Sequence, residues 1–259
     1  FFLMFIDGVG ALVSVAKPMQ FIKVTPIATK HTGPVKRAIL QAIKSFELKG
    51  ISINAVRFDR EPAIHAIRDD LQRALPAGVN MTAATESEPI AERSARTLKN
   101  TVRSVMVDLP FRVPRKVIGE LLKYAARRVN MLGISCLSRG VTPLELFTGR
   151  KTDMKTELRY AFGDFGQAHF AIVDNSMSKR TTGCIAMRPS GNVEGSWRFL
   201  SLETKQVTTR QKVHPATDAD RNHQPPKLHD RTRTTPHGGR TRISNRLAGR
   251  LYQPGDLLQ

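Results

Sequence analysis

The chain has 259 residues, of which 40% are hydrophobic, so it is long enough for one large domain or two modest ones and is not disordered throughout. Lysine and arginine number 41 against 22 aspartates and glutamates, and the net charge of +19 favours a polyanionic partner, most often nucleic acid. Two cysteines are too few for a disulfide framework or a cysteine-rich zinc site, which makes a reducing compartment the simplest environment.

The first 27 residues predict an antiparallel meander of three strands. Apolar runs at 1–7, 9–16 and 21–27 are rich in Phe, Val and Ile, and Gly and Pro residues punctuate them. The opening run stops at Asp7 and has no basic segment before it, so it is interpreted as a buried strand and not as a signal peptide or a membrane span. Since the chain does not begin with Met, it is interpreted as a piece of a longer protein.

Helices and strands are predicted to alternate after this meander. Apolar residues at three- and four-residue spacing over 35–46 predict a helix that Gly50 ends. A strand over Ile51–Phe58, a helix over Pro62–Leu75 and a short strand over Val79–Thr85 follow.

The clearest helical period in the sequence ends at Pro110, and a further helix is predicted from about Pro114 to Met131. One apolar stripe runs along the first of these two helices and consists of Ala91, Ala95, Leu98, Val102, Val105 and Leu109.

This order of elements is typical of a mixed α/β fold. Over residues 1–150 it matches the RNase H-like layout, a five-stranded mixed sheet with flanking helices. Residues 151–213 hold short strand candidates separated by Gly, Asn, Ser and Pro, which predict a small β-rich module. Residues 214–259 are rich in Arg, Thr, Pro and His with few apolar residues, so a basic disordered tail is predicted there.

Three acids stand at the ends of elements in this layout. Phosphodiester transfer uses two divalent ions about 4 Å apart, and carboxylates are their natural ligands. Asp7 ends the first predicted strand, Asp59 ends the fourth, and Glu92 begins the strongly periodic helix. Because the first and fourth strands are neighbours in an RNase H-like sheet, the carboxylates are expected at one edge, within reach of Glu92.

Each acid also has an ordinary structural explanation. Asp7-Gly8 is a sequence typical of a hairpin turn. Asp59 is placed to cap the helix that begins near Pro62. Glu92 is placed to favour the positive end of its helix or to pair with Arg96 one turn later.

A row of cations follows Glu92 on one side of the same helix. Arg96, Lys99 and Arg103 are spaced three or four residues apart, so they share a face with the acid. We interpret them as DNA-binding residues, because phosphate contacts require only Lys and Arg within reach. A solvated, salt-bridged surface would show the same pattern.

The spacing of the acids resembles the Asp, Asp, Glu triad of retroviral and retrotransposon integrases, with 51 residues between Asp7 and Asp59 and 32 between Asp59 and Glu92. The stretch 89–103 is similar to the helix that bears the catalytic Glu in that family. Residues 142–149, with their Pro, Glu, Phe and Gly, resemble the end of a copia-type core, and the resemblance extends over residues 1–213.

The resemblance implies a polyprotein fragment that acts as a polynucleotidyl transferase in retroelement DNA integration. Asp7, Asp59 and Glu92 would be catalytic and would hold two Mg²⁺ or Mn²⁺ ions. The implied partners are DNA, as element ends and target, and further copies of the chain in a homo-oligomer when active; no membrane is implied. The implied location is the nucleus, with a cytoplasmic particle stage.

The sequence departs from the family after Asp59, where Arg60-Glu61-Pro62 replaces a small residue and Gly. Glu61 is therefore an alternative ligand to Asp59, and Glu88 is an alternative to Glu92. Two other functions remain open. One is a non-catalytic, nucleic-acid-binding relic of a retrotransposon polyprotein, and the other is a different RNase H-like nuclease.

Overall fold

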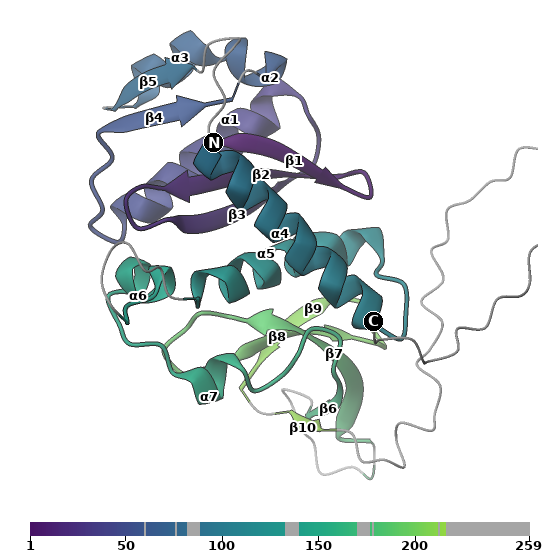
Figure 1. Cartoon of the computed structure of the whole chain (residues 1–259). Coiled ribbons are helices and arrows are strands. Elements are labelled where there is room, and N and C mark those ends of the chain that lie inside the picture. Colours follow the sequence, from purple (N-terminus) through teal and green to yellow (C-terminus); the bar gives the residue numbers. More distant parts are fainter. Residues whose placement is uncertain are drawn as a thin grey trace, which may run out of the picture. The chain divides into compact units, whose positions relative to one another are not determined.

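The computed structural model of the chain describes residues 1–59, 61–75, 77–81, 89–132, 140–169, 177, 179–211 and 213–215. It has a mixed α/β architecture, with helices packed around a sheet of three strands and an antiparallel β module that follows them (Figure 1). The predicted tail, apart from His214 and Pro215, lies outside the described residues.

The predicted meander forms the antiparallel sheet β1-β2-β3, which confirms the expected order of its strands. Asp7 and Gly8 form the two-residue turn between paired Ile6 and Val9, and both have positive φ angles, 46° and 77°. That geometry suits the right-handed twist of a hairpin, so the turn interpretation of Asp7-Gly8 is confirmed. The strands are β1 (Phe2–Ile6), β2 (Val9–Ala16) and β3 (Phe21–Ile27).

Both faces of this sheet are covered, which explains why its strands are apolar runs and do not alternate with polar residues. Leu12 and Ile27 face a core formed with α1 (Thr32–Glu47), whereas Met4, Ala11 and Val24 face a second core. The second core is formed with α4 (Pro89–Asp108) and α5 (Arg115–Asn130).

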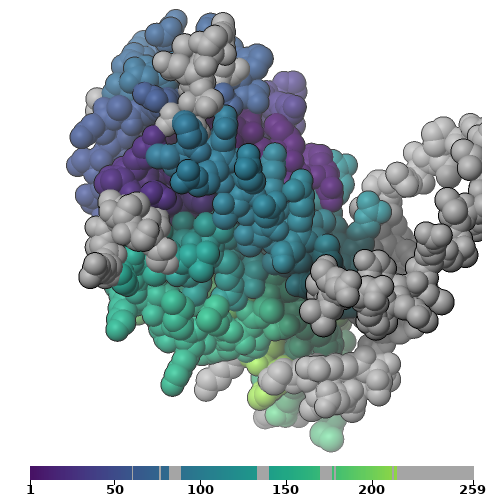
Figure 2. All heavy atoms as spheres, in the orientation of Figure 1, coloured from purple at the N-terminus to yellow at the C-terminus, as the bar shows by residue number. Residues whose placement is uncertain are grey.

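The predicted stripe of α4 packs against the second core, so this prediction is confirmed. Leu98 and Val102 are buried, and the other four stripe residues are partly buried against the same core. The opposite side of α4 is exposed, and Figure 2 shows this helix at the surface of the molecule.

The region between α1 and α4 is less regular than predicted. The strand expected over 51–58 is formed only at β4 (Ala55–Phe58), which pairs in parallel with β5 (Gly78–Met81). The helix expected over 62–75 is divided, because Ile67 leaves the helical conformation while its side chain is buried. Its two parts are α2 (Pro62–His65) and α3 (Arg68–Ala74).

The expected five-stranded sheet is replaced by a sheet of three strands and a pair of strands, and two hydrogen bonds join them. The amino group of Phe1 donates to the Arg57 carbonyl at 2.7 Å, and the Asp59 amide donates to the Phe1 carbonyl at 2.9 Å. This pattern places Phe1 beside Phe58 in a parallel pair.

The β module is an antiparallel sheet with the order β10-β6-β7-β8-β9. Trp197 and Phe199 belong to the same core as α4 and α5, so the segment after residue 150 shares a core with the helices before it. The module follows α6 (Pro143–Thr148) and α7 (Met154–Glu157), and its strands are β6 (Phe165–His169), β7 (Thr181–Pro189), β8 (Trp197–Ser201), β9 (Val207–Arg210) and β10 (His214–Pro215).

Buried charges also connect α5 to the module. The Glu120 carboxylate accepts a hydrogen bond from Arg188 of β7 at 2.7 Å and lies 3.5 Å from Arg198 of β8. Burial raises the pKa of Glu120, but the nearby cations outweigh this effect and hold its pKa below the ordinary value. Glu120 is therefore ionised at neutral pH.

None of the helices in the described residues is long and apolar enough to cross a membrane.

A buried amide joins α5 to the edge strand β3. The Asn130 side chain accepts from the Ile22 amide at 2.8 Å and donates to the Ile22 carbonyl at 2.7 Å. Asn130 is only 2% exposed, so its amide takes the place that a neighbouring strand would fill.

We predict that Asn130→Ala lowers the free energy of unfolding by about 2–4 kcal/mol, because it leaves two buried backbone groups of Ile22 without partners. Urea unfolding followed by circular dichroism would measure the change. Asn100→Ala, on the exposed side of α4, is the matched control and should leave stability nearly unchanged. A loss below about 1 kcal/mol for Asn130→Ala would contradict the prediction.

Candidate functional site

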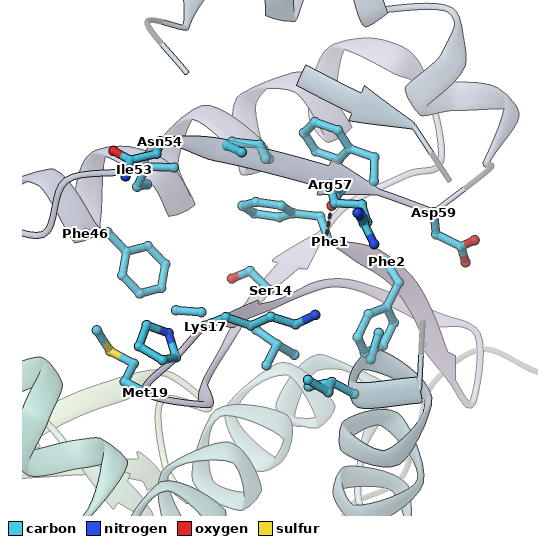
Figure 3. A pocket seen from close by; sticks show the side chains of 18 of the residues that line it. Phe1, Phe2, Ser14, Lys17, Met19, Phe46, Ile53, Asn54, Arg57 and Asp59 are labelled. Atoms are coloured by element: carbon cyan, nitrogen blue, oxygen red, sulfur yellow. Dashed lines mark hydrogen bonds between the residues drawn. The ribbon is translucent and has the colours of Figure 1, made fainter. Parts of the chain in front are cut away.

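A pocket of about 780 Å³ lies where β1, β4 and the start of α4 meet. Two of the three predicted acids, Asp59 and Glu92, line it. Figure 3 shows Asp59 at one end of the pocket, and Phe46 and Met19 at the other, with Lys17 and Arg57 between them.

Asp59 and Glu92 reach the pocket from different elements. Asp59 directly follows β4, and its backbone amide is held by the hydrogen bond to Phe1. Glu92 is an exposed residue in the first turn of α4, where a carboxylate also interacts favourably with the helix dipole. Ala91 and Ala95 line the pocket beside it, so the helix approaches the strands closely through small side chains.

Asp7 lies elsewhere, and the expectation that it emerges beside Asp59 is corrected by the strand register. Because Phe1 is paired with Phe58, the β1 residue level with Asp59 is Phe2. Asp7 lies five residues further along the strand, about 17 Å away at the usual rise per residue. It is in the β1–β2 turn and is not among the residues that line the pocket.

Phe2 therefore occupies the position at which a carboxylate would complete the set. Its side chain is 8% exposed and belongs to the core formed with α4 and α5. The described lining of the pocket offers two carboxylates, together with the cations Lys17 and Arg57. The described lining therefore holds one carboxylate fewer than the predicted set of three, and these two alone do not make up the predicted two-metal centre.

The alternative acids do not complete such a centre within the described part of the chain. Glu61 is the residue before α2 and is not among the residues that line the pocket. His65 is exposed on α2. Glu88 lies outside the described residues. No group of three or more His, Cys, Asp or Glu side chains that could hold a metal ion is present among the residues that are described.

The predicted cationic face of α4 is exposed to solvent. Arg96, Lys99 and Arg103 are all exposed, and Arg103 donates to the Asn100 side chain at 3.3 Å. Arg93 is exposed one turn before Arg96. The helix thus carries exposed cations from the edge of the pocket along its outer side.

Two cations of the pocket were not predicted from the sequence. Arg57 lies on β4 between buried Val56 and Phe58, and this alternation was a signal that could have placed it on the α4 side of the strand. Lys17 lies in the turn after β2, where no local pattern indicates that it faces β4.

No protein-family model and no curated protein matches the chain. Among solved structures, the catalytic core domain of BIV integrase is 20% identical, with a TM-score of 0.45, and the match covers 57% of this chain and 90% of that one. The HTLV-2 integrase catalytic core domain in complex with magnesium, in its trimeric form, is 17% identical over 56% of this chain and 90% of that one, with a TM-score of 0.41. Its dimeric form is 18% identical over 54% and 84%, also with a TM-score of 0.41.

We predict that Phe2→Asp creates a metal-binding site. The new carboxylate would be level with Asp59 and covered by the turn of α4 that holds Glu92. A divalent ion that binds the folded state raises its stability. Mn²⁺ should therefore raise the melting temperature of Phe2→Asp, measured by differential scanning calorimetry against EDTA.

Phe2→Asn is the matched control, because it removes the same core side chain without adding a charge. It should show no response to Mn²⁺ beyond that of the wild type. An equal response of both variants would mean that Phe2 does not face the two acids.

Proposed function

We propose that the chain is an integrase-type, RNase H-like domain that binds DNA along α4 and does not itself carry out phosphodiester transfer. The observation that carries the proposal is the exposed row of Arg96, Lys99 and Arg103, which begins one turn after Glu92 at the edge of the pocket. The net charge of +19 supports a polyanionic partner for the whole chain.

The dimensions of the row suit a nucleic-acid backbone. Arg103 lies seven positions after Arg96, so the row is about 10 Å long at the helical rise per residue. The row carries three cations on long side chains, so it can contact up to three phosphates of a DNA backbone. Exposed cations contribute little to folding stability, so these three are free to contact a ligand without loss of the fold.

The topology supports the RNase H-like interpretation. If the hydrogen bonds of Phe1 are taken as a link between β1 and β4, the strands follow the order β3-β2-β1-β4-β5. Helix α1 covers one face of this arrangement, and α4 and α5 cover the other. We accordingly interpret the chain as a part of a retroelement polyprotein whose partners are DNA and, in an assembly, further copies of the chain.

We propose that the chain lacks transfer chemistry because Asp7 lies outside the pocket that Asp59 and Glu92 line. A turn at the far end of β1 removes it from the pocket, and Phe2 stands in its place. The function that remains is recognition of the DNA backbone, which requires only cations in reach.

We predict that the triple variant Arg96→Gln, Lys99→Gln, Arg103→Gln weakens DNA binding and makes it less dependent on salt. Each lost phosphate contact reduces the slope of log K against log salt by about 0.9, so the slope should fall by about 2–3. Fluorescence anisotropy of a labelled duplex between low and moderate salt would measure both quantities.

The matched control is Lys49→Gln, Arg68→Gln, Arg150→Gln, which removes one lysine and two arginines from other exposed positions. It should retain most of the wild-type slope. If the two triple variants lose the same affinity, the attraction comes from net charge alone, and α4 is not the binding surface.

Polynucleotidyl transfer is the second candidate, because Asp59 and Glu92 do line one pocket. It requires a third carboxylate beyond those that the described lining contains. We predict that the wild-type chain neither cleaves nor joins branched DNA with Mn²⁺, and that Glu92→Gln binds DNA as tightly as the wild type. Cleavage by the wild type that Glu92→Gln abolishes would establish the enzyme instead.

A further inference from the structure

A second pocket, of about 470 Å³, lies between β3, α5 and β7, apart from the Asp59 pocket. Four cationic side chains line it: Lys23 of β3, Lys123 and Arg127 of α5, and Arg188 of β7. The lining described for it includes no Asp or Glu. We refer to it below as the basic cavity.

The carboxylates near the basic cavity do not balance its cations. The Glu120 carboxylate lies within 3.5 Å of Arg188, Lys123 and Arg198, so a single negative charge is shared among three positive charges. Arg127 is paired with Glu157, whose Oε2 atom accepts from its Nε atom at 2.6 Å.

Lys23 adds a further charge. Among the contacts described for it, its ammonium group donates to the Ser45 hydroxyl and lies 6.0 Å from the centre of the Phe46 ring, and none of them is with a carboxylate. Five cations and two carboxylates therefore leave an excess of three positive charges around the basic cavity.

These charges are held in an environment that disfavours them. Burial lowers the pKa of Lys23, and the charge of Lys123 lowers it further. Burial also lowers the pKa of Lys123, which Glu120 offsets in part. An anion in the basic cavity would relieve both the repulsion and the loss of hydration, whereas the exposed cations of α4 are already hydrated.

The donors suit phosphate chemistry. The ammonium groups of Lys23 and Lys123 supply compact charge with donors that can turn toward a phosphate oxygen. Arg188 donates through Nε to Glu120 and through Nη1 to the Pro189 carbonyl, which leaves its Nη2 group as the donor for an anion. The Nε and Nη2 atoms of Arg127 both donate to Glu157, so Arg127 contributes mainly charge. The volume exceeds that of a single phosphate, and the excess charge of three suits an anion with more than one phosphate group.

We propose that the basic cavity binds a compact anion with several phosphate groups through Lys23, Lys123 and Arg188. This site is distinct from the DNA-binding row of α4 and does not rest on it. Because its cations come from β3, α5 and β7, a bound anion would also hold the three-stranded sheet, α5 and the β module together. Ligand binding would therefore appear as an increase in thermal stability.

The experiment is calorimetric titration of the whole chain with sodium tripolyphosphate, with inorganic phosphate as the weaker probe. We expect the double variant Lys23→Gln, Lys123→Gln to lose about a hundredfold in tripolyphosphate affinity, or about tenfold for each charged hydrogen bond. The control Lys49→Gln, Lys116→Gln removes two exposed lysines outside the lining and should bind like the wild type.

Two further measurements keep the test decisive. Without anion, Lys23→Gln should melt near the wild-type temperature, because it removes a repelled charge; a large loss of stability would mean that Lys23 has a structural role and would overturn the proposal. Equal losses in both double variants, or no binding by the wild type, would also overturn it. If Lys23→Gln, Lys123→Gln loses DNA affinity as strongly as tripolyphosphate affinity, the cavity is part of a DNA surface and the compact-anion proposal fails.

Discussion

The fold depends on helix α5, because other elements pack against several of its sides. Its buried residues do not lie on a single narrow stripe, since Leu121 and Leu122 are adjacent and both fully buried, and Tyr124, Ala125 and Ala126 follow. A helix of this kind is stable in water only if other elements cover several of its sides. The three-stranded sheet, α4 and the β module do so, and Figure 1 shows α5 between the sheet and the module. The segment after residue 150 is thus part of the fold's main core.

The same arrangement sets the position of α4. One side of this helix packs into the core through Leu98 and Val102, so the other side is exposed to solvent. Since the first turn of α4 reaches the pocket at β1 and β4, the exposed cations begin beside the two acids and continue away from them. The two acids of the pocket and the exposed cations of α4 are therefore neighbours along one helix.

Positive charge has two environments in this protein, and they favour different ligands. On α4 the cations are exposed to water, which suits the backbone of a long polyanion and a strong dependence of binding on salt. Around the basic cavity they are half-buried and held by Glu120 and Glu157, so a ligand there must be compact and must replace water at several groups together. The net charge of the chain does not distinguish these two groups of cations, but the burial of their side chains does.

The sequence by itself determined the local features of the protein. The periods of α1, α4 and α5, the three-stranded meander and the Asp7-Gly8 turn all depend on residues that are near each other in the chain, so their patterns are visible in the sequence. Tertiary structure alone decided which distant residues meet. The pairing of Phe1 with Phe58 placed Phe2, and not Asp7, beside Asp59, because strand ends need not align when the strands differ in length. Lys23 and Lys123 likewise come together only through the packing of α5 on β3, which no spacing in the sequence encodes.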